Sequence, residues 1–477
     1  MSDDVPVFVV VGNVNQGKSS IVATLSEDPT VPIASHPGTT RKSGDYVFSS
    51  GDRPLFKLID TPGFQEARAV LAWMQERSFS ALDHPDTVRA FVDEHGGDAR
   101  FQDEVRLLRP VLDGASVIYV VDASGPPQPS NEAEMEILRW TGRPGMALVN
   151  RTRERDHASE WRPYLEQFFN VVREFDAHGA GFSERMELLR SFRAIRDEWR
   201  VALDESIEVM EREWTNRRAR AATVIAEAVV RMLAHVERRR LPAEGDPTDL
   251  DRRDLETAYL KALRGFEADA RVEIENVYRH RRVARSDDDL ALHDADLFSD
   301  VSWRAFGLTR AQLAQYGVAW GLAIGAAIDM MVGGFSFFLG AAIGAAAGGI
   351  AGFLGGTRVA RAWGDRSKLA RTLFPGEHGR FMGMGPATNP RFAWMVVDRS
   401  LVHFRAARDR AHASKDPLDL SSAEPSESKK RGVVATLDSS VRGELDRTLQ
   451  KILKQAVRGS VSDDTEVRLR GLLKEIL

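Results

Sequence analysis

Short apolar runs alternate with stretches of helical periodicity through the first part of the chain. The runs cover residues 7–11, 55–59, 117–121, 146–149 and 171–175. Apolar runs of this length, separated by helical segments, are typical of a doubly wound, mostly parallel β-sheet covered by helices. We therefore expect an α/β domain over residues 1–182. Residues 65–114 are longer than a usual connection and have a helical pattern, which predicts a helical insertion in this domain.

From residue 183 onward the apolar positions recur every three or four residues, as on one face of a helix. Examples are Leu188, Phe192, Ile195, Trp199 and Leu203. Further helical patterns at residues 221–236 and 255–278 predict an all-α region over residues 183–312. The arginine-rich stretches of this region, including residues 238–240, are expected to be solvated helix surface. Contact with anionic lipid or RNA is the alternative.

Residues 313–356 contain one charged side chain, Asp329. A break at residues 333–336 divides them into two halves of about 20 residues, each long enough to cross a bilayer as a helix. Glycine recurs at every fourth position in each half, and such faces let helices pack closely in lipid. Arginines flank both ends, which suits a hairpin with both ends on the cytoplasmic side. We expect two transmembrane helices. A hairpin buried in a soluble core, or exposed only on activation, is the alternative.

The last segments are predicted to be a mostly helical part at residues 357–411, a flexible linker at 412–432 and two helices at 433–477. Those two helices form a peripheral cap or dock a partner. The 65 basic and 70 acidic residues give a formal charge of -5, which argues against wholesale nucleic-acid binding. Because the chain has no cysteine, disulfides and thiolate metal sites are excluded.

A phosphate-binding motif lies where the first predicted strand passes into a helix. In such a loop, successive backbone amides and the dipole of the following helix surround the phosphates. Lys18 adds a point charge at the β- and γ-phosphates, and Ser19 offers its hydroxyl to Mg²⁺. The motif predicts nucleoside triphosphate hydrolysis, and its nucleotide-binding residues are Gly12, Asn13, Val14, Asn15, Gln16, Gly17, Lys18, Ser19 and Ser20.

Two further elements follow in the order expected of a nucleotide switch. Thr39 and Thr40 lie between the first and second predicted strands, where Thr40 is the candidate hydroxyl ligand of Mg²⁺. Asp60 ends the second strand and is expected to reach Mg²⁺ through water. Gly63, three residues later, is expected to bring its amide close to the γ-phosphate. Lys18, Thr40 and Gly63 are therefore candidate catalytic residues.

At these residues the chain resembles the translation-factor class of GTPases, and within it the Era and tRNA-modification branch. That branch has Gly-Thr-Thr-Arg in its first switch segment and Asp-Thr-Pro-Gly in its second, as here. The resemblance covers roughly the first 180 residues and implies GTP and GDP as ligands. In this branch a hydrophobic residue, here Phe64, replaces the catalytic glutamine of Ras-type proteins. Some relatives hold a potassium ion with an asparagine of the phosphate loop. Asn15 is the candidate here, with simple loop hydrogen bonding as the alternative.

The base-specificity motif departs from the pattern of that class. The family has Asn-Lys-x-Asp after a strand, whereas here Asn150 is followed by Arg151 and position 153 is an arginine. The carboxylate that accepts two hydrogen bonds from guanine is therefore missing. Asn150 remains the candidate for the base edge, and Ala177 stands where the family has Ser-Ala-Lys. A preference for guanine therefore depends on Asn150 and Ala177.

The whole arrangement is also similar to a bacterial family of Era-like GTPases that carries a domain of unknown function and a glycine-rich apolar hairpin. Residues 138–143, 296–299 and 303–307 carry this resemblance. The leading hypothesis is a membrane-associated GTPase, acting as a switch or in membrane remodelling, at the cytoplasmic face of the bacterial inner membrane. A cytosolic protein is expected if the hairpin is buried. The alternatives are an Era-type ribosome or RNA assembly GTPase and a nucleotide-gated scaffold with little hydrolysis.

The partners expected from this hypothesis follow from the hairpin and the nucleotide site. Membrane lipid would contact residues 313–356, and a membrane or regulatory protein would respond to the nucleotide state. A second copy of the chain could associate through the glycine-lined faces of residues 313–356 or through the nucleotide-binding domain at residues 1–182. Nucleic acid is not expected as a partner.

Overall fold

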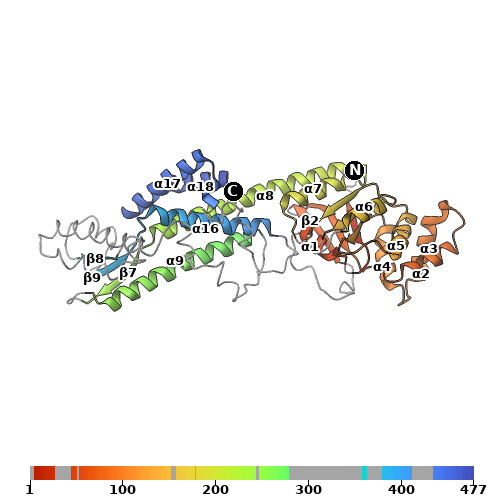
Figure 1. Ribbon diagram of the computed structural model, residues 1–477, viewed down its shortest axis with the longest axis horizontal. Helices are drawn as coiled ribbons and strands as arrows, with labels where there is room; N and C mark the ends of the chain where they lie inside the picture. Colours follow the sequence, from red (N-terminus) through yellow and green to blue (C-terminus); the bar gives the residue numbers. More distant parts are fainter. Residues whose placement is uncertain are drawn as a thin grey trace. The chain divides into compact units, whose positions relative to one another are not determined.

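The computed structural model describes residues 5–14, 16–26, 44–50, 53–151, 157–177, 179–242, 247–278, 357–362, 379–410 and 433–477 (Figure 1). They divide into two compact units. The first extends to Thr215, and the second starts at Asn216 and holds most of the described residues after it. The predicted hairpin at residues 313–356 and the predicted linker at 412–432 lie outside the described residues.

A six-stranded sheet in the order β2-β3-β1-β4-β5-β6 forms the centre of the first unit. All neighbouring strands are parallel except β2 and β3, which confirms the predicted mostly parallel α/β fold. Because Val10 pairs with Asp60 and Val11 with Tyr119, the carboxyl ends of β1, β3 and β4 meet at one edge. The strands are β1 (Val7–Val11), β2 (Gly44–Ser50), β3 (Arg53–Asp60), β4 (Ser116–Asp122), β5 (Gly145–Asn150) and β6 (Val172–Phe175).

The sequence does not predict strand β2. This strand lies at the edge of the sheet and pairs with β3 alone. Its exposed and half-buried positions alternate, and only Tyr46 and Phe48 pack against the core. A half-exposed edge strand has no continuous apolar run, which is why the hydrophobic pattern missed it.

Helices cover both faces of the sheet. One face packs against α1 (Lys18–Ser26) and α7 (Phe182–Phe192) through a core that contains Phe8 and Val10. The alternate residues Val9 and Val11 belong to the core of the opposite face. Residues 65–114, predicted to be a helical insertion, form several of the helices on this second face. The helices of this second face are α2 (Ala67–Gln75), α3 (His84–Glu94), α4 (Gln102–Leu112), α5 (Pro129–Trp140) and α6 (Ala158–Leu165). The short η1 (Ala81–Asp83) precedes α3 and has no buried residue.

The second unit is mostly helical. Helix α8 (Arg200–Ala234), which follows the short η2 (Asp197–Trp199), begins in the first unit and ends in the second. The helical pattern from Leu188 to Leu203 is interrupted between α7 and α8, and α8 then continues without a break into the pattern predicted at 221–236. The other helices are α9 (Asp249–Val277), α16 (Pro390–Asp409), η4 (Val433–Thr436), α17 (Ser439–Val457) and α18 (Asp463–Ile476).

The prediction of an all-α C-terminal region is wrong, because this unit also holds a three-stranded antiparallel sheet. Its order is β7-β9-β8, with β7 (Glu237–Leu241), β8 (Thr357–Ala362) and β9 (Gly379–Met384). Residues 238–240 therefore lie in a strand and not on a helix surface. Alternation along β7 turns Arg239 toward α9, where it pairs with Asp254 at 2.7 Å and Asp251 at 3.3 Å. Strands paired across such long stretches of sequence leave little local signal.

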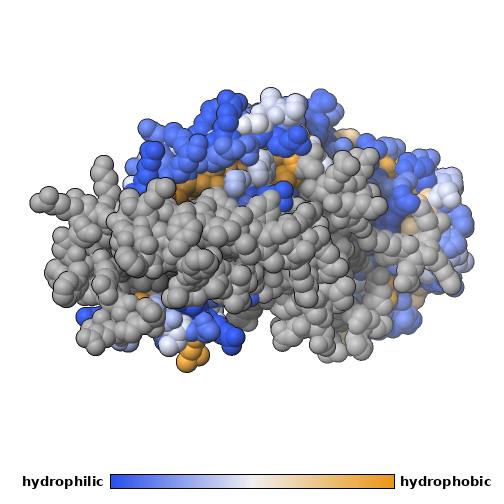
Figure 2. All heavy atoms as spheres, turned by 60° about the vertical axis from the view of Figure 1, so that its left-hand side comes forward, coloured by the Kyte–Doolittle hydropathy of each residue, from blue (hydrophilic) through white to orange (hydrophobic). Residues whose placement is uncertain are grey.

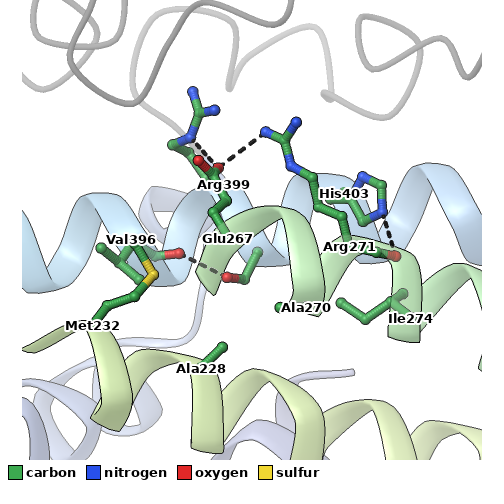
Figure 3. Close-up of a pocket in the computed structure, with 10 residues that line it drawn as sticks. Ala228, Met232, Glu267, Ala270, Arg271, Ile274, Val396, Arg399 and His403 are labelled. Carbon is green, nitrogen blue, oxygen red and sulfur yellow. Dashed lines mark hydrogen bonds and ion pairs between the residues drawn. The ribbon is translucent and has the colours of Figure 1, made fainter. Parts of the chain in front are cut away.

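A small pocket in the second unit is lined by α8, α9 and α16 (Figure 3). Ala228, Met232 and Val396 form part of its apolar wall. Glu267 of α9 accepts hydrogen bonds from Arg271 at 3.0 Å and from Arg399 of α16 at 2.8 Å. Since a carboxylate bound by two guanidinium groups is well compensated for its loss of water, this ion pair fixes α16 on α9.

On the face shown in Figure 2, the described residues present mostly hydrophilic side chains. None of the helices within the described ranges is both long and apolar enough to cross a bilayer.

Candidate functional site

The phosphate loop joins β1 to α1 at the carboxyl edge of the sheet. Gly12 has a φ of +145°, and a Cβ atom there would lie 2.3 Å from the carbonyl oxygen of Val120. Both the backbone conformation and the space therefore require glycine. The amide of Val14 donates to Asn13 Oδ1 at 2.7 Å, and Ile21 N donates to the carbonyl of Gly17 at 3.0 Å, in the first turn of α1. The loop thus ends directly at a helix N-terminus, which favours anion binding.

Lys18 lies beneath this loop and is almost fully buried. Its Nζ donates to the carbonyl oxygens of Gly12 at 3.2 Å and Asn13 at 2.7 Å. Burial lowers the pKa of Lys18 to about 8, and the nearby carboxylates of Asp60 and Glu134 partly oppose that shift. An ammonium group held in this way, away from bulk water, interacts strongly with an arriving phosphate.

Ser19 and Asp60 come together from α1 and the end of β3. Ser19 Oγ donates to Asp60 Oδ2 at 2.7 Å. A hydroxyl and a carboxylate are the oxygen ligands that Mg²⁺ prefers, so this pair fits such a site. Thr39 and Thr40, the predicted switch residues, lie outside the described residues, as does Asn15.

The Asp-Thr-Pro-Gly segment lies directly against the phosphate loop. A Cβ atom on Gly63 would lie 2.5 Å from the backbone nitrogen of Val14, so only glycine allows this approach. The amide of Phe64 donates to the carbonyl of Gly12 at 3.2 Å. The ring of Phe64 is buried in the core, and it has no polar atom that could orient water.

Asn150 connects the phosphate loop to the loop after β6. Its Nδ2 donates to the carbonyl of Gln16 at 3.4 Å, and its Oδ1 accepts from the amide of Ala177 at 3.3 Å. Gln16 in turn accepts a hydrogen bond from the amide of Asp122 through its side chain. The predicted base-site residues Asn150 and Ala177 are therefore adjacent. Ser20 is buried on α1.

Two buried glutamates near the site were not predicted from the sequence. Glu134 of α5 accepts from Asn13 Nδ2 at 3.0 Å and from the Tyr119 hydroxyl at 2.9 Å. Burial raises its pKa to about 7, although those hydrogen bonds and the charge of Lys18 lower it. Glu104 of α4 accepts two backbone hydrogen bonds from the segment after Phe64. Each is one acidic residue among several on a helix with polar neighbours, so the sequence carried no signal for it.

Two family comparisons cover most of the chain. Residues 7–144 match the family described as "50S ribosome-binding GTPase". Residues 162–466 match the family described as "Domain of unknown function (DUF3482)". The resemblance to Era-like GTPases with a further C-terminal domain is therefore confirmed.

Individual relatives match a part of the chain. GTPase Der of Lactobacillus acidophilus is 31% identical over 142 residues, which are 29% of this chain and 32% of that protein. GTPase Era of Acidimicrobium ferrooxidans is 34% identical over 107 residues, which are 21% of this chain and 36% of that protein. The chain thus spans about a third of the length of these curated relatives.

Solved structures of Era are also similar. An Era variant from Aquifex aeolicus bound to GDP and AlF4⁻ matches with a TM-score of 0.29 and 16% identity, over 57% of this chain and 89% of that one. Era in complex with MgGDPNP and a segment of 16S ribosomal RNA matches with the same TM-score and 14% identity, over the same shares. The chain therefore belongs to the DUF3482 family, and its N-terminal part is a GTPase domain of the Era/Der-like kind that precedes DUF3482.

Proposed function

We propose that this chain hydrolyses GTP to GDP and phosphate and works as a nucleotide switch. The observation that supports this most is the convergence of Lys18, Ser19 and Asp60 beneath a loop against which Gly63 is packed. These groups match the needs of phosphoryl transfer, which are positioning and charge neutralisation.

Each residue has a separate role in this proposal. The amides of the loop from Gly12 to Gly17 bind the phosphates, and Lys18 neutralises charge on the β- and γ-phosphates. Ser19 and Thr40 would hold Mg²⁺ directly, and Asp60 would do so through water. When bound, Mg²⁺ would supply positive charge that offsets the negative charge of the phosphates. The Gly63 amide contacts the γ-phosphate, so that loss of this phosphate releases both switch segments.

Because Phe64 is buried and apolar, another group must orient the water that attacks the γ-phosphate. Asn15 is the candidate ligand of a potassium ion, whose charge would offset the negative charge that develops in the transition state. Asn150 and Ala177 are the candidates for guanine binding. Purified full-length protein should therefore turn over GTP faster than ATP, and faster in potassium than in sodium. Equal rates in both salts would remove the role of Asn15, and an absence of GTP turnover in any salt would refute the proposed reaction.

The cellular role in this proposal is that of a membrane-associated switch or remodelling protein. Its support is the composition of residues 313–356, with one charged side chain and regular glycines. Lipid, a regulatory protein at the cytoplasmic face of the bacterial inner membrane, and a second copy of the chain are the proposed partners. Deleting residues 313–356 should release the protein from membranes in fractionation. Unchanged sedimentation with membranes would refute the anchor.

A second candidate is a ribosome assembly role. Its support is the match of residues 7–144 to a family described as 50S ribosome-binding GTPases. Co-sedimentation with ribosomal subunits in the presence of a GTP analogue, but not with GDP, would favour this role over the membrane role.

A further inference from the structure

Glu104 is a fully buried carboxylate on the first turn of α4. Its Oε1 accepts hydrogen bonds from two successive backbone amides, Gln65 N at 2.8 Å and Glu66 N at 2.7 Å. These two residues follow Gly63 and Phe64 and lead directly into α2. Glu104 therefore binds the end of the second switch segment from another helix.

Burying the Glu104 carboxylate costs free energy of desolvation, so the contacts that compensate it are informative. Glu66, the residue that precedes α2, provides no side-chain cap, and Glu104 binds the backbone there in its place. The positive N-terminal end of α2 and two charge-assisted hydrogen bonds stabilise the carboxylate. Its second oxygen, Oε2, is buried and has no hydrogen-bond partner among the described residues. An apolar residue would fill the same space without this loss of hydration, so packing alone does not explain a glutamate here.

The segment is thus fastened at two points. At one end, Phe64 N donates to the carbonyl of Gly12, and at the other, Glu104 binds the amides of Gln65 and Glu66. Gly63, which approaches the backbone of Val14, directly precedes the first of these contacts. Both contacts follow Gly63 in the chain, so together they fix the peptide group between Gly63 and Phe64 and the direction in which the chain leaves Gly63.

We propose that Glu104 is a positioning residue for GTP hydrolysis. By binding the amides of Gln65 and Glu66 it holds the Gly63 amide where the γ-phosphate lies, and it ties the start of α2 to α4. This inference rests on the proposed hydrolysis of GTP and adds a residue outside the recognised motifs.

The chain offers a matched control on the same segment. Arg100, two residues before the start of α4, pairs with the Glu66 carboxylate at 2.7 Å, but the two side chains are 60% and 41% exposed. An exposed ion pair contributes little because water and salt screen it. Arg100→Ala therefore removes a contact to the same segment without removing the buried acceptor.

The test uses full-length protein and the variants Glu104→Ala, Glu104→Gln and Arg100→Ala. We measure kcat with saturating GTP and Mg²⁺, affinity for a fluorescent GDP analogue, and amide hydrogen exchange of residues 63–67. Glu104→Ala should lower kcat at least about 10-fold, because a small misplacement of reacting groups has effects of this size. GDP affinity should stay within about twofold, since the phosphate loop is intact, and exchange at residues 65 and 66 should rise.

Glutamine retains one carbonyl oxygen that can accept both amides, so Glu104→Gln should lose only about two- to fivefold in kcat. Arg100→Ala should match the wild type. A wild-type kcat in Glu104→Ala, a raised kcat, or unchanged exchange at residues 65 and 66 would overturn the inference. If Glu104→Ala does not fold, Glu104→Gln decides: a kcat about two- to fivefold below the wild type supports the inference, and a wild-type or raised kcat overturns it. If the wild type itself releases no phosphate, the proposed function is refuted. A wild-type rate in Glu104→Ala refutes only the role of Glu104, so the two failures can be distinguished.

Discussion

The phosphate loop and the segment from Gly63 to Glu66 lie side by side, yet different contacts hold them. The loop is fixed within itself, through the φ of Gly12 and the hydrogen bonds of the Lys18 side chain to loop carbonyls, and Glu134 and Asn150 add hydrogen bonds from outside. The Gly63–Glu66 segment is fixed from outside, by the carbonyl of Gly12 on one side and the carboxylate of Glu104 on the other.

This difference suits the two tasks of a nucleotide switch. A loop that binds phosphate in every nucleotide state benefits from being rigid. A segment that responds to one phosphate must be able to leave its place, and a few long-range hydrogen bonds can be broken without unfolding the domain. Variants that affect one region and spare the other therefore test the comparison directly.

The largest expected effect comes from Lys18→Ala. Removing the buried ammonium takes away the charge that neutralises the β- and γ-phosphates, so GTP turnover should fall by at least about 100-fold. Phosphate release under single-turnover conditions measures this loss. A variant that keeps more than a tenth of the wild-type rate would show that this loop is not the catalytic one.

Gly12→Ala should damage the loop itself. The new Cβ atom would lie 2.3 Å from the carbonyl oxygen of Val120, in a backbone conformation that alanine avoids. The free energy of unfolding should fall by about 2–4 kcal/mol, and GDP binding should weaken. Gly97→Ala is the control, because a Cβ atom there meets nothing within 4 Å. Similar urea unfolding curves for both variants would argue against a rigid loop.

The free energy of unfolding should depend on pH through Glu134, which contacts the phosphate loop through Asn13. Burial raises its pKa from 4.5 to about 7, so folding favours the protonated carboxyl. Its contribution to stability is fully present below pH 4.5 and is lost as pH rises through 7, on the order of 1–3 kcal/mol. Glutamine cannot titrate, so wild type should lose stability relative to Glu134→Gln between pH 5 and pH 8. A constant difference between their unfolding free energies across this range would contradict the assignment.

The smallest effect is expected from Arg53→Ala. Arg53 pairs with Glu205 at 2.8 Å, but the two side chains are 61% and 47% exposed. Stability should change by less than about 0.5 kcal/mol, and GTP turnover should not change. A thermal unfolding scan and a turnover assay suffice, and a larger loss would mean that exposed contacts also fix the domain.

The sequence predicts the phosphate loop well because its chemistry is local. Consecutive residues from Gly12 to Ser19, between an apolar run and a helical pattern, specify both the backbone path and the ligand groups. The parallel sheet follows from the same kind of signal, since its buried strands are short apolar runs.

Contacts between distant segments could not be predicted in this way. Glu104 meets Gln65 and Glu66 only because α4 packs beside the start of α2, and nothing around residue 104 reveals that partner. The strand that contains the arginines of β7 could not be predicted for a similar reason, because its partner strand β9 lies far along the chain. A half-exposed strand with charged alternation resembles a polar helix when its partners are unknown.

The most direct test of the central claim is phosphate release from GTP by the purified full-length chain before and after removal of Mg²⁺. The arrangement of Lys18, Ser19 and Asp60 predicts release that stops when EDTA is added and returns when Mg²⁺ is restored in excess. Release that continues unchanged in EDTA, or no release of phosphate with Mg²⁺ present, would contradict it.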